Sequence, residues 1–231
     1  MREPLVLVPG MMCDARLFAP QIAAFSAQHP IVHVTPTGAT SMQDFAQSVL
    51  DTAPPRFALA GLSMGGIIAM EVIRRAPERV SRVAFLDTNP LADPPEKAPI
   101  RVAQVAKVNN GGLKEVLREE MKPNYLADGP AQQNILDLCM QMAVTLGPKA
   151  FAEQSHAIQT RPDQSETLRQ ISVPALVLCG QEDQLCPVAR HELMHSLVAH
   201  SKLTIISDAG HLPTLEQPDQ TNEALQEWLN M

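Results

Sequence analysis

The chain has 231 residues, of which 45% are hydrophobic and 19% charged, and a formal net charge of −7. These values are typical of a globular protein of one or two domains, and the surplus of carboxylates would repel a phosphate backbone, so we expect no nucleic-acid partner. Because no stretch approaches the roughly 20 apolar residues of a membrane span and the first residues lack a signal-peptide pattern, we predict a cytoplasmic protein with no membrane partner.

Six short apolar runs alternate with helical segments along the chain. Because these runs are continuous, both faces of each predicted strand should be covered, as in a parallel sheet. Strands and helices in alternation indicate right-handed βαβ units and hence a doubly wound α/β fold. The predicted strands cover residues 5–8, 31–34, 57–60, 83–86, 175–179 and 203–206.

Three of the intervening helices carry clear start or stop signals. Ser41 is expected to cap one, with Asp44 three residues later in a variant of the capping box. A second helix begins at the glycine-rich turn over 61–66 and ends before Pro77. The last is predicted over about 218–229, with Pro218 in its first turn.

The region from residue 90 to about residue 168 breaks this alternation. It contains no convincing strand, and several prolines mark its entry and exit. Apolar residues inside it recur at helical spacing. We therefore predict a core domain formed by residues 1–89 and 169–231, with a helical insertion over 90–168 laid across the sheet.

The sharpest motif is Gly61-Leu62-Ser63-Met64-Gly65, which follows a predicted strand directly and opens a helix. In that context G-x-S-x-G indicates a nucleophile elbow, a tight turn that raises a serine hydroxyl above the sheet. The backbone of such a turn is strained, and side chains at the flanking glycines would collide with it. Ser63 is therefore the predicted nucleophile.

A serine hydroxyl is a weak nucleophile at neutral pH and needs a base, which an acid must orient. Candidates follow the last two predicted strands. Gly180-Gln181-Glu182-Asp183 comes after the fifth, and Asp208-Ala209-Gly210-His211 comes after the sixth.

The segments VPALVLCGQED at 173–183 and DAGHLPTLEQP at 208–218 resemble the acid and histidine loops of the α/β-hydrolase superfamily. GLSMGG at 61–66 and RAPERV at 75–80 are similar to it as well, so the resemblance covers nearly the whole chain outside the insertion, which matches the family's helical cap in position. It implies that Ser63 attacks an acyl carbon, that His211 moves the proton and that Asp183 orients His211. It implies no metal and no organic cofactor.

Two other carboxylates compete with Asp183 for the role of acid. Glu182 precedes it, but the family pattern places the acid at the second of these positions. Asp87 follows the fourth predicted strand, where some relatives carry the acid, and ranks second.

The resemblance also implies two main-chain N–H donors for an oxyanion, those of Met64 and Met11. The sequence departs from the family at three places. Pro9-Gly10 stands where relatives commonly carry His-Gly, and Thr35-Pro36-Thr37-Gly38 replaces an acidic, glycine-rich turn. The opening antiparallel hairpin is not expected, which leaves about six parallel strands rather than the family's eight.

A competing motif is His191-Glu192-Leu193-Met194-His195, which fits the H-E-x-x-H pattern of zinc proteases. The extended form of that motif needs glycine at 198 and histidine at 201, where Val198 and Ser201 stand. We therefore interpret this helix as one that packs on the sheet. The four cysteines show no CxxC pair and no zinc-finger spacing, so we expect reduced, space-filling thiols.

These observations predict a serine hydrolase that cleaves small carboxylic esters or lactones through an acyl-enzyme. C–C bond hydrolysis and acyl transfer on the same triad remain open, as does a non-catalytic ligand-binding protein on this scaffold. The insertion should line the substrate pocket, with Met121, Tyr125, Met142 and Phe151 as candidates. The expected partner is a small-molecule ester or lactone, and a homodimer is left open.

Overall fold

The computed structural model describes residues 2–231. Six strands form one parallel sheet in the order β2-β1-β3-β4-β5-β6. The prediction of a doubly wound α/β fold with about six parallel strands is confirmed. The strands are β1 (Leu5–Val8), β2 (Ile31–His33), β3 (Phe57–Leu62), β4 (Val80–Leu86), β5 (Ala175–Gly180) and β6 (Ser201–Ile206).

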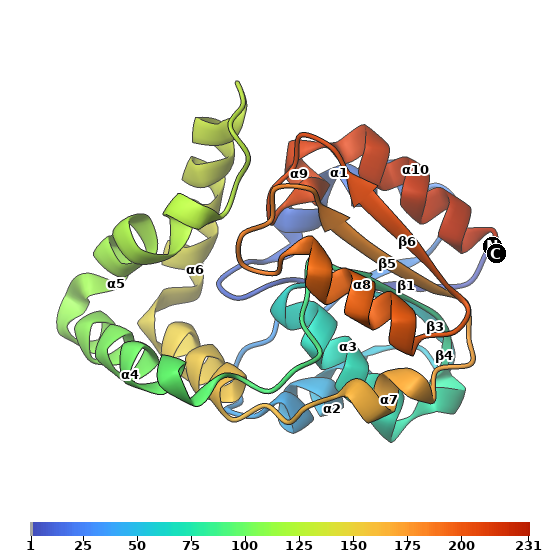
Figure 1. Cartoon of the computed structure of the whole chain (residues 1–231), viewed down its shortest axis with the longest axis horizontal. Coiled ribbons are helices and arrows are strands. Elements are labelled where there is room, and N and C mark those ends of the chain that lie inside the picture. The colour runs from blue at the N-terminus through green and yellow to red at the C-terminus, as the bar shows by residue number, and fades with distance from the viewer. Residues whose placement is uncertain (1) are drawn as a thin grey trace.

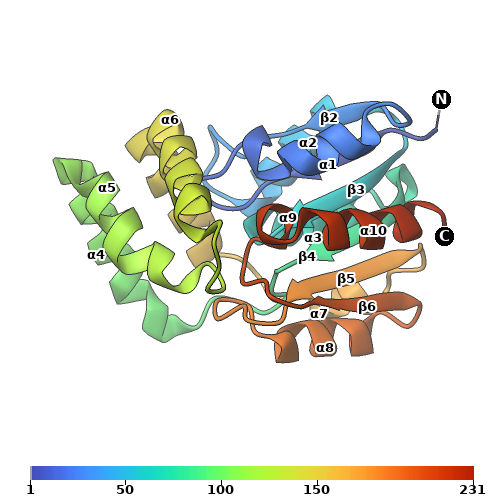
Figure 2. The ribbon, with the colours of Figure 1, turned by 90° about the horizontal axis from the view of Figure 1, so that it is seen from above.

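Helices cover both faces of this sheet (Figures 1 and 2). One face is covered by α1 (Ala19–Phe25) and α10 (Pro218–Leu229). The other is covered by α2 (Met42–Thr52), α3 (Met64–Arg75), α7 (Ser165–Arg169) and α8 (Val188–Leu197). The short α9 (Pro213–Glu216) precedes α10.

Alternate residues of each strand enter opposite apolar layers. In β1, Val6 and Val8 pack in the cluster that contains α2 and α3, whereas Leu5 and Leu7 pack in the cluster that contains α1 and α10. All four side chains are fully buried. This double burial explains why the strands read as continuous apolar runs in the sequence.

The predicted start and stop residues lie at the ends of three helices. The main-chain N–H of Asp44 donates to Ser41 Oγ at 3.1 Å, which caps α2. Helix α3 ends at Arg75, two residues before Pro77, and α10 begins at Pro218.

Between β4 and β5 the chain is helical, with α4 (Ala98–Lys107), α5 (Leu113–Glu115) and α6 (Gln132–Gln159). These helices lie beyond the carboxyl ends of the strands, beside the core (Figure 2). We call residues 90–156 the cap, because Ala157 and Ile158 at the end of α6, and Leu168 in α7, already pack in the cluster of α3. The cap so defined is the larger part of the insertion predicted over residues 90–168.

None of the helices described between residues 2 and 231 combines the length and the apolar character needed to cross a bilayer.

Candidate active site

Ser63 lies on the turn between β3 and α3, with φ 55° and ψ −116°. This left-handed backbone is strained for a residue with a side chain. Two glycines make the turn possible. A Cβ at Gly61 would lie 2.2 Å from the carbonyl oxygen of Gly65, and a Cβ at Gly65 would lie 1.9 Å from that of Val8 in β1.

Thr88, just after β4, fixes the main chain of this turn. Its hydroxyl donates to the carbonyl oxygen of Ser63 at 2.7 Å, while the N–H of Ser63 donates to that of Leu86 at 2.9 Å. Gly66 leaves room for the contact, because a Cβ there would lie 2.6 Å from Thr88. Sequence reasoning missed Thr88, which has no motif around it.

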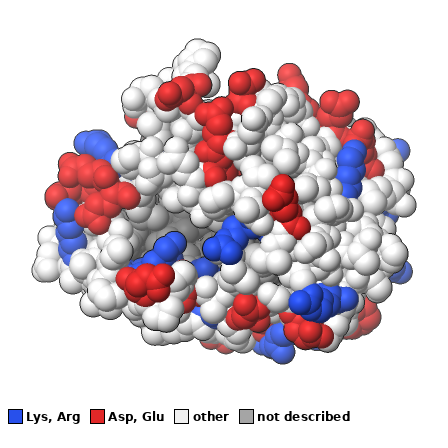
Figure 3. All heavy atoms as spheres, viewed as in Figure 1, with Lys and Arg blue, Asp and Glu red and all other residues white. Residues whose placement is uncertain are grey.

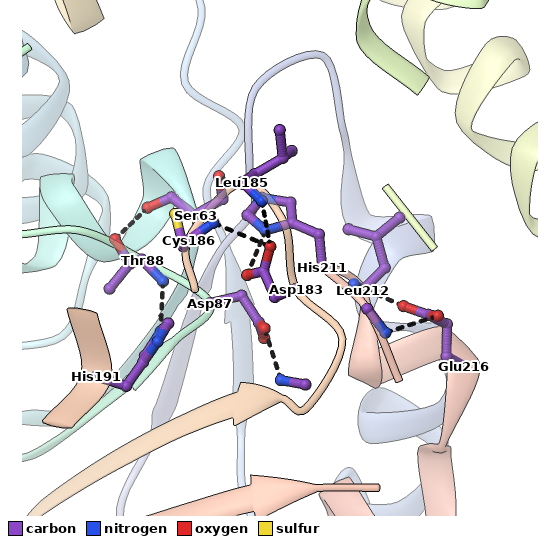
Figure 4. Close-up of polar contacts among 12 residues, drawn as sticks. Ser63, Asp87, Thr88, Asp183, Leu185, Cys186, His191, His211, Leu212 and Glu216 are labelled. Carbon is purple, nitrogen blue, oxygen red and sulfur yellow. Dashed lines mark hydrogen bonds and ion pairs between the residues drawn. The ribbon is translucent and has the colours of Figure 1, made fainter. Parts of the chain in front are cut away.

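Ser63, His211 and Asp183 form one hydrogen-bonded line (Figure 4). His211 Nε2 lies 2.9 Å from Ser63 Oγ, and His211 Nδ1 lies 2.8 Å from Asp183 Oδ2. Asp183 and His211 are each 4% exposed. Glu182, the alternative to Asp183, is exposed.

Asp183 is held as a carboxylate. Burial alone would raise its pKa, but the charge of His211, their hydrogen bond and two main-chain donors hold that pKa below the ordinary value. The donors are the N–H groups of Leu185 and Cys186, at 2.8 and 3.0 Å from Asp183 Oδ1.

Asp87, the second-ranked acid, is fully buried close to Asp183 (Figure 4). Its Oδ1 accepts from the N–H of Gly180 at 2.9 Å, and its Oδ2 has no hydrogen-bond partner among residues 2–231. Burial, and then the negative charge of Asp183, raise the pKa of Asp87 well above the usual range. This shift favours the neutral form of Asp87, and the carboxylate that bonds to His211 is Asp183.

The two histidines of the H-E-x-x-H pattern serve different contacts. His191 is fully buried, and its Nε2 accepts from the N–H of Thr88 at 3.0 Å. Burial lowers the pKa of His191 to about 4, so its ring is neutral. His195 is exposed and bonds to Ser201. Of the two histidines that a zinc site on this motif would need, His191 thus already uses its Nε2 to bind the main chain of Thr88.

One group of metal-ligand types lies close together in the described chain: Asp183, Cys186 and His211, whose ligand atoms are within 4.8 Å of one another. Two of the three already bond to each other. Burial raises the pKa of the Cys186 thiol well above its usual value, which disfavours the thiolate that a metal would need.

Glu216 in α9 holds the loop that carries His211. Its two oxygens accept from three main-chain N–H groups, those of Gly210 at 2.9 Å, Leu212 at 2.9 Å and Ala127 at 2.8 Å. The N–H of His211 donates to the carbonyl oxygen of Tyr125 at 2.6 Å. Glu216 thus ties the histidine loop to the cap. The glutamate stands within the quoted histidine-loop motif, but its spacing alone gave no reason to single it out.

The two residues predicted to supply the oxyanion donors lie at the same cavity as Ser63. Met11 and Met64 both line the cavity that contains Ser63 and His211. No hydrogen bond within residues 2–231 uses the main-chain N–H of either, and Met64 begins α3, where N–H groups lack an intrahelical acceptor. Gly10 packs this loop against the elbow, since a Cβ there would lie 3.3 Å from Ser63 Cβ.

Gln154 of α6 fixes the loop that carries Met11. Its side chain is fully buried, accepts from the N–H of Met12 at 2.8 Å and donates to the carbonyl oxygen of Pro36 at 2.7 Å. Gln154 therefore links the cap to both loops where the sequence departs from the family pattern.

The cavity above Ser63 has a volume of about 460 Å³ and lies between the cap and the carboxyl ends of the strands. That size suits a small organic ligand. Of the four candidate lining residues, Met121 and Tyr125 line it. Met142 and Phe151 do not: both are fully buried in apolar clusters because they face the neighbouring helices and loops rather than the cavity.

Comparison with known proteins places this geometry in a family. The model of the "Alpha/beta hydrolase family" matches residues 5–224. The chain belongs to this family. The resemblance noted in the sequence is thus confirmed for the fold and the family.

Several members are similar over nearly their full length. The chain is 28% identical to a pimeloyl-[acyl-carrier protein] methyl ester esterase of Legionella pneumophila, covering 94% of this chain and 90% of that protein. It is 23% identical to 3-oxoadipate enol-lactonase 2 of Acinetobacter baylyi, covering 97% and 88%. The malate-bound structure of a thermophilic esterase from Thermogutta terrifontis superposes with a TM-score of 0.88 at 28% identity, covering 99% of this chain and 89% of that one.

Gly65→Ala should destabilise the protein by about 3 kcal/mol, because the added methyl group overlaps the Val8 carbonyl and the main chain must shift. Gly129→Ala is the matched control, since a Cβ there meets no atom within 4 Å. Denaturant unfolding of both variants measures the difference. Equal stability of the two variants would contradict this account of the turn.

Asp87→Asn tests whether residue 87 is neutral. The folded state keeps the Asp87 proton at pH values where the unfolded chain has already released it. The unfolding free energy of the wild type should therefore fall relative to that of the variant by about 1.4 kcal/mol per pH unit. This fall should span the range from the ordinary carboxyl pKa up to the raised one. Unfolding free energies measured from about pH 5 to about pH 8 test the slope. A constant difference over this range would show that Asp87 is ionised in the folded protein.

Glu216→Gln should lower kcat roughly 10- to 100-fold and reduce stability, because an amide NH₂ would face at least one of the three N–H donors. Glu223→Gln is the control, on an exposed glutamate of α10. Steady-state kinetics and thermal unfolding report both effects. Unchanged kinetics would mean that the His211 loop keeps its position without this carboxylate.

Proposed function

We propose that this hydrolase cleaves small carboxylic esters or lactones through an acyl-enzyme on Ser63. The observation that carries the proposal is the line from Ser63 Oγ through His211 to Asp183, beside two N–H groups with no acceptor in the described chain. The named activities of the similar proteins, ester and enol-lactone hydrolysis, agree with this chemistry.

In the first half of the reaction, Ser63 Oγ attacks the carbonyl carbon while His211 Nε2 takes the serine proton. The resulting oxyanion accepts from the N–H groups of Met11 and Met64. When the tetrahedral intermediate collapses, the leaving alkoxide takes the proton from His211. For a lactone that alkoxide stays attached to the acyl group.

In the second half, His211 removes a proton from a water molecule that attacks the acyl-enzyme, and the acid leaves as Ser63 regains its proton. Asp183 fixes the tautomer of His211 and stabilises its charged form throughout. The raised pKa of Asp87 favours its neutral form, which adds no second negative charge beside this pair.

Ser63→Ala should lower kcat on short-chain p-nitrophenyl esters by roughly 10⁴-fold or more while the fold stays intact. It should also abolish labelling by a fluorophosphonate probe, which reports an activated serine. Ser207→Ala, on an exposed serine just after β6, should keep both. A folded wild type that neither turns over esters and lactones nor takes the label would favour a non-catalytic binding protein.

A further inference from the structure

The cavity above Ser63 has a cationic side. Lys97, Arg101 and Arg161 all line it, together with the reacting residues. Figure 3 shows Lys and Arg side chains at the edge of a hollow in this face of the molecule. The chain as a whole carries a net charge of −7, so the charge at this cavity wall has the opposite sign to that of the protein. Such a contrast concentrates anions in the cavity.

Ion pairs within the protein neutralise only part of this charge. Asp93 is the one carboxylate between the two arginines: its Oδ2 lies 2.6 Å from Arg101 Nε, and its Oδ1 lies 3.0 Å from Arg161 Nη1. Lys97 makes no ion pair with any residue from 2 to 231. The other acid of the lining, Glu120, already pairs with Lys107. The two arginines therefore share one carboxylate, and Lys97 pairs with none.

The fixed arginine keeps donor capacity toward the cavity. Arg161, whose side chain is 6% exposed, donates through Nε to the carbonyl oxygen of Leu91 at 2.9 Å and through Nη1 to that of Ile158 at 3.2 Å. Its Nη2 has no hydrogen-bond partner in the described chain and is not among the sealed buried atoms. A guanidinium held in this way is suited to a planar anion such as a carboxylate.

These cations lie close to the reacting groups. The Cys186 sulfur is within 4.8 Å of the ligand atoms of Asp183 and His211. Cys186, Arg161 and Lys97 line the same cavity as Ser63 and His211, and the charges of both cations oppose the rise that burial gives the pKa of Cys186. A small substrate whose ester carbonyl sits at Ser63 can therefore place a second group against them.

We propose that Lys97, Arg101 and Arg161 bind a carboxylate carried by the substrate, so that the preferred substrates are half-esters of dicarboxylic acids or lactones that bear a free carboxylate. This rests on the proposed function and names its substrate class. Asp93 sets the orientation of the two arginines, and Lys97 supplies the unpaired charge.

The test compares two substrates of nearly equal size that differ in charge: 4-nitrophenyl hydrogen glutarate, an anion, and its neutral methyl ester, 4-nitrophenyl methyl glutarate. The wild type should favour the anion in kcat/KM by about 10- to 100-fold, the range of a hydrogen bond to a charged group, and added salt should reduce that preference. Lys97→Met should lower the ratio at least about fivefold. Lys114→Met, on an exposed lysine of α5, should keep the wild-type ratio.

Equal use of both substrates by the wild type, or an unchanged ratio in Lys97→Met, would overturn the proposal. Equal loss on both substrates would also overturn it, because the cation would then serve the reacting carbonyl rather than a second carboxylate. Calorimetric binding of glutarate to Ser63→Ala tests the site without turnover. Hydrolysis of neither ester would refute the proposed function, whereas glutarate binding that Lys97→Met fails to weaken would refute the carboxylate site alone.

Discussion

The close approach of α3 to β1 governs the whole site. Gly65 packs so tightly on the carbonyl of Val8 that no side chain fits between them. This contact fixes where the strained turn leaves the sheet, and with it the direction of Ser63 Oγ and of the Met64 N–H. The β1 loop with Gly10 lies against the same turn, so the two predicted oxyanion donors and the nucleophile share one rigid base. The strain at Ser63 persists because hydrogen bonds from β4 and Thr88 oppose its relaxation.

Three carboxyl groups lie around the histidine loop, two of them buried, and each has a different task. Ionising two adjacent carboxyl groups in a buried site costs free energy, because burial and the like charge both disfavour the second negative charge. Asp183 receives the imidazole and two N–H donors, and its pKa is lowered. Asp87 receives one donor, and its burial raises its pKa, which favours the protonated form. Glu216 faces three main-chain donors and acts on position rather than on charge. The histidine is thus oriented by one carboxylate, while its loop is held by a second carboxyl group through the main chain.

Strand periodicity and glycine spacing predicted the fold and the place of Ser63, because both are local properties of the chain. The order of the loops after β3, β5 and β6 then predicted which side chains would meet. Contacts between distant segments could not be predicted from the sequence. Thr88, Gln154 and Glu216 bond mainly to main-chain groups, and no sequence motif marks them. Met142 and Phe151 were assigned to the pocket from apolar character alone, which cannot distinguish a helix face that lines a cavity from one that packs inward. His191 matched a zinc motif because helical spacing places two histidines on one side of a helix, whatever lies opposite them.

The cap does more than cover the sheet, because it joins specificity to the reaction centre. Through Gln154 it holds the N–H of Met12, next to a predicted oxyanion donor, and through Tyr125 and Ala127 it contacts the His211 loop and Glu216. Asp93, in the same insertion, holds Arg101 and Arg161 at the cavity wall. The same insertion therefore carries the proposed carboxylate site and the contacts to the His211 loop and the oxyanion loop. Binding energy from a remote charged group would then improve alignment at the carbonyl, which raises kcat rather than only lowering KM.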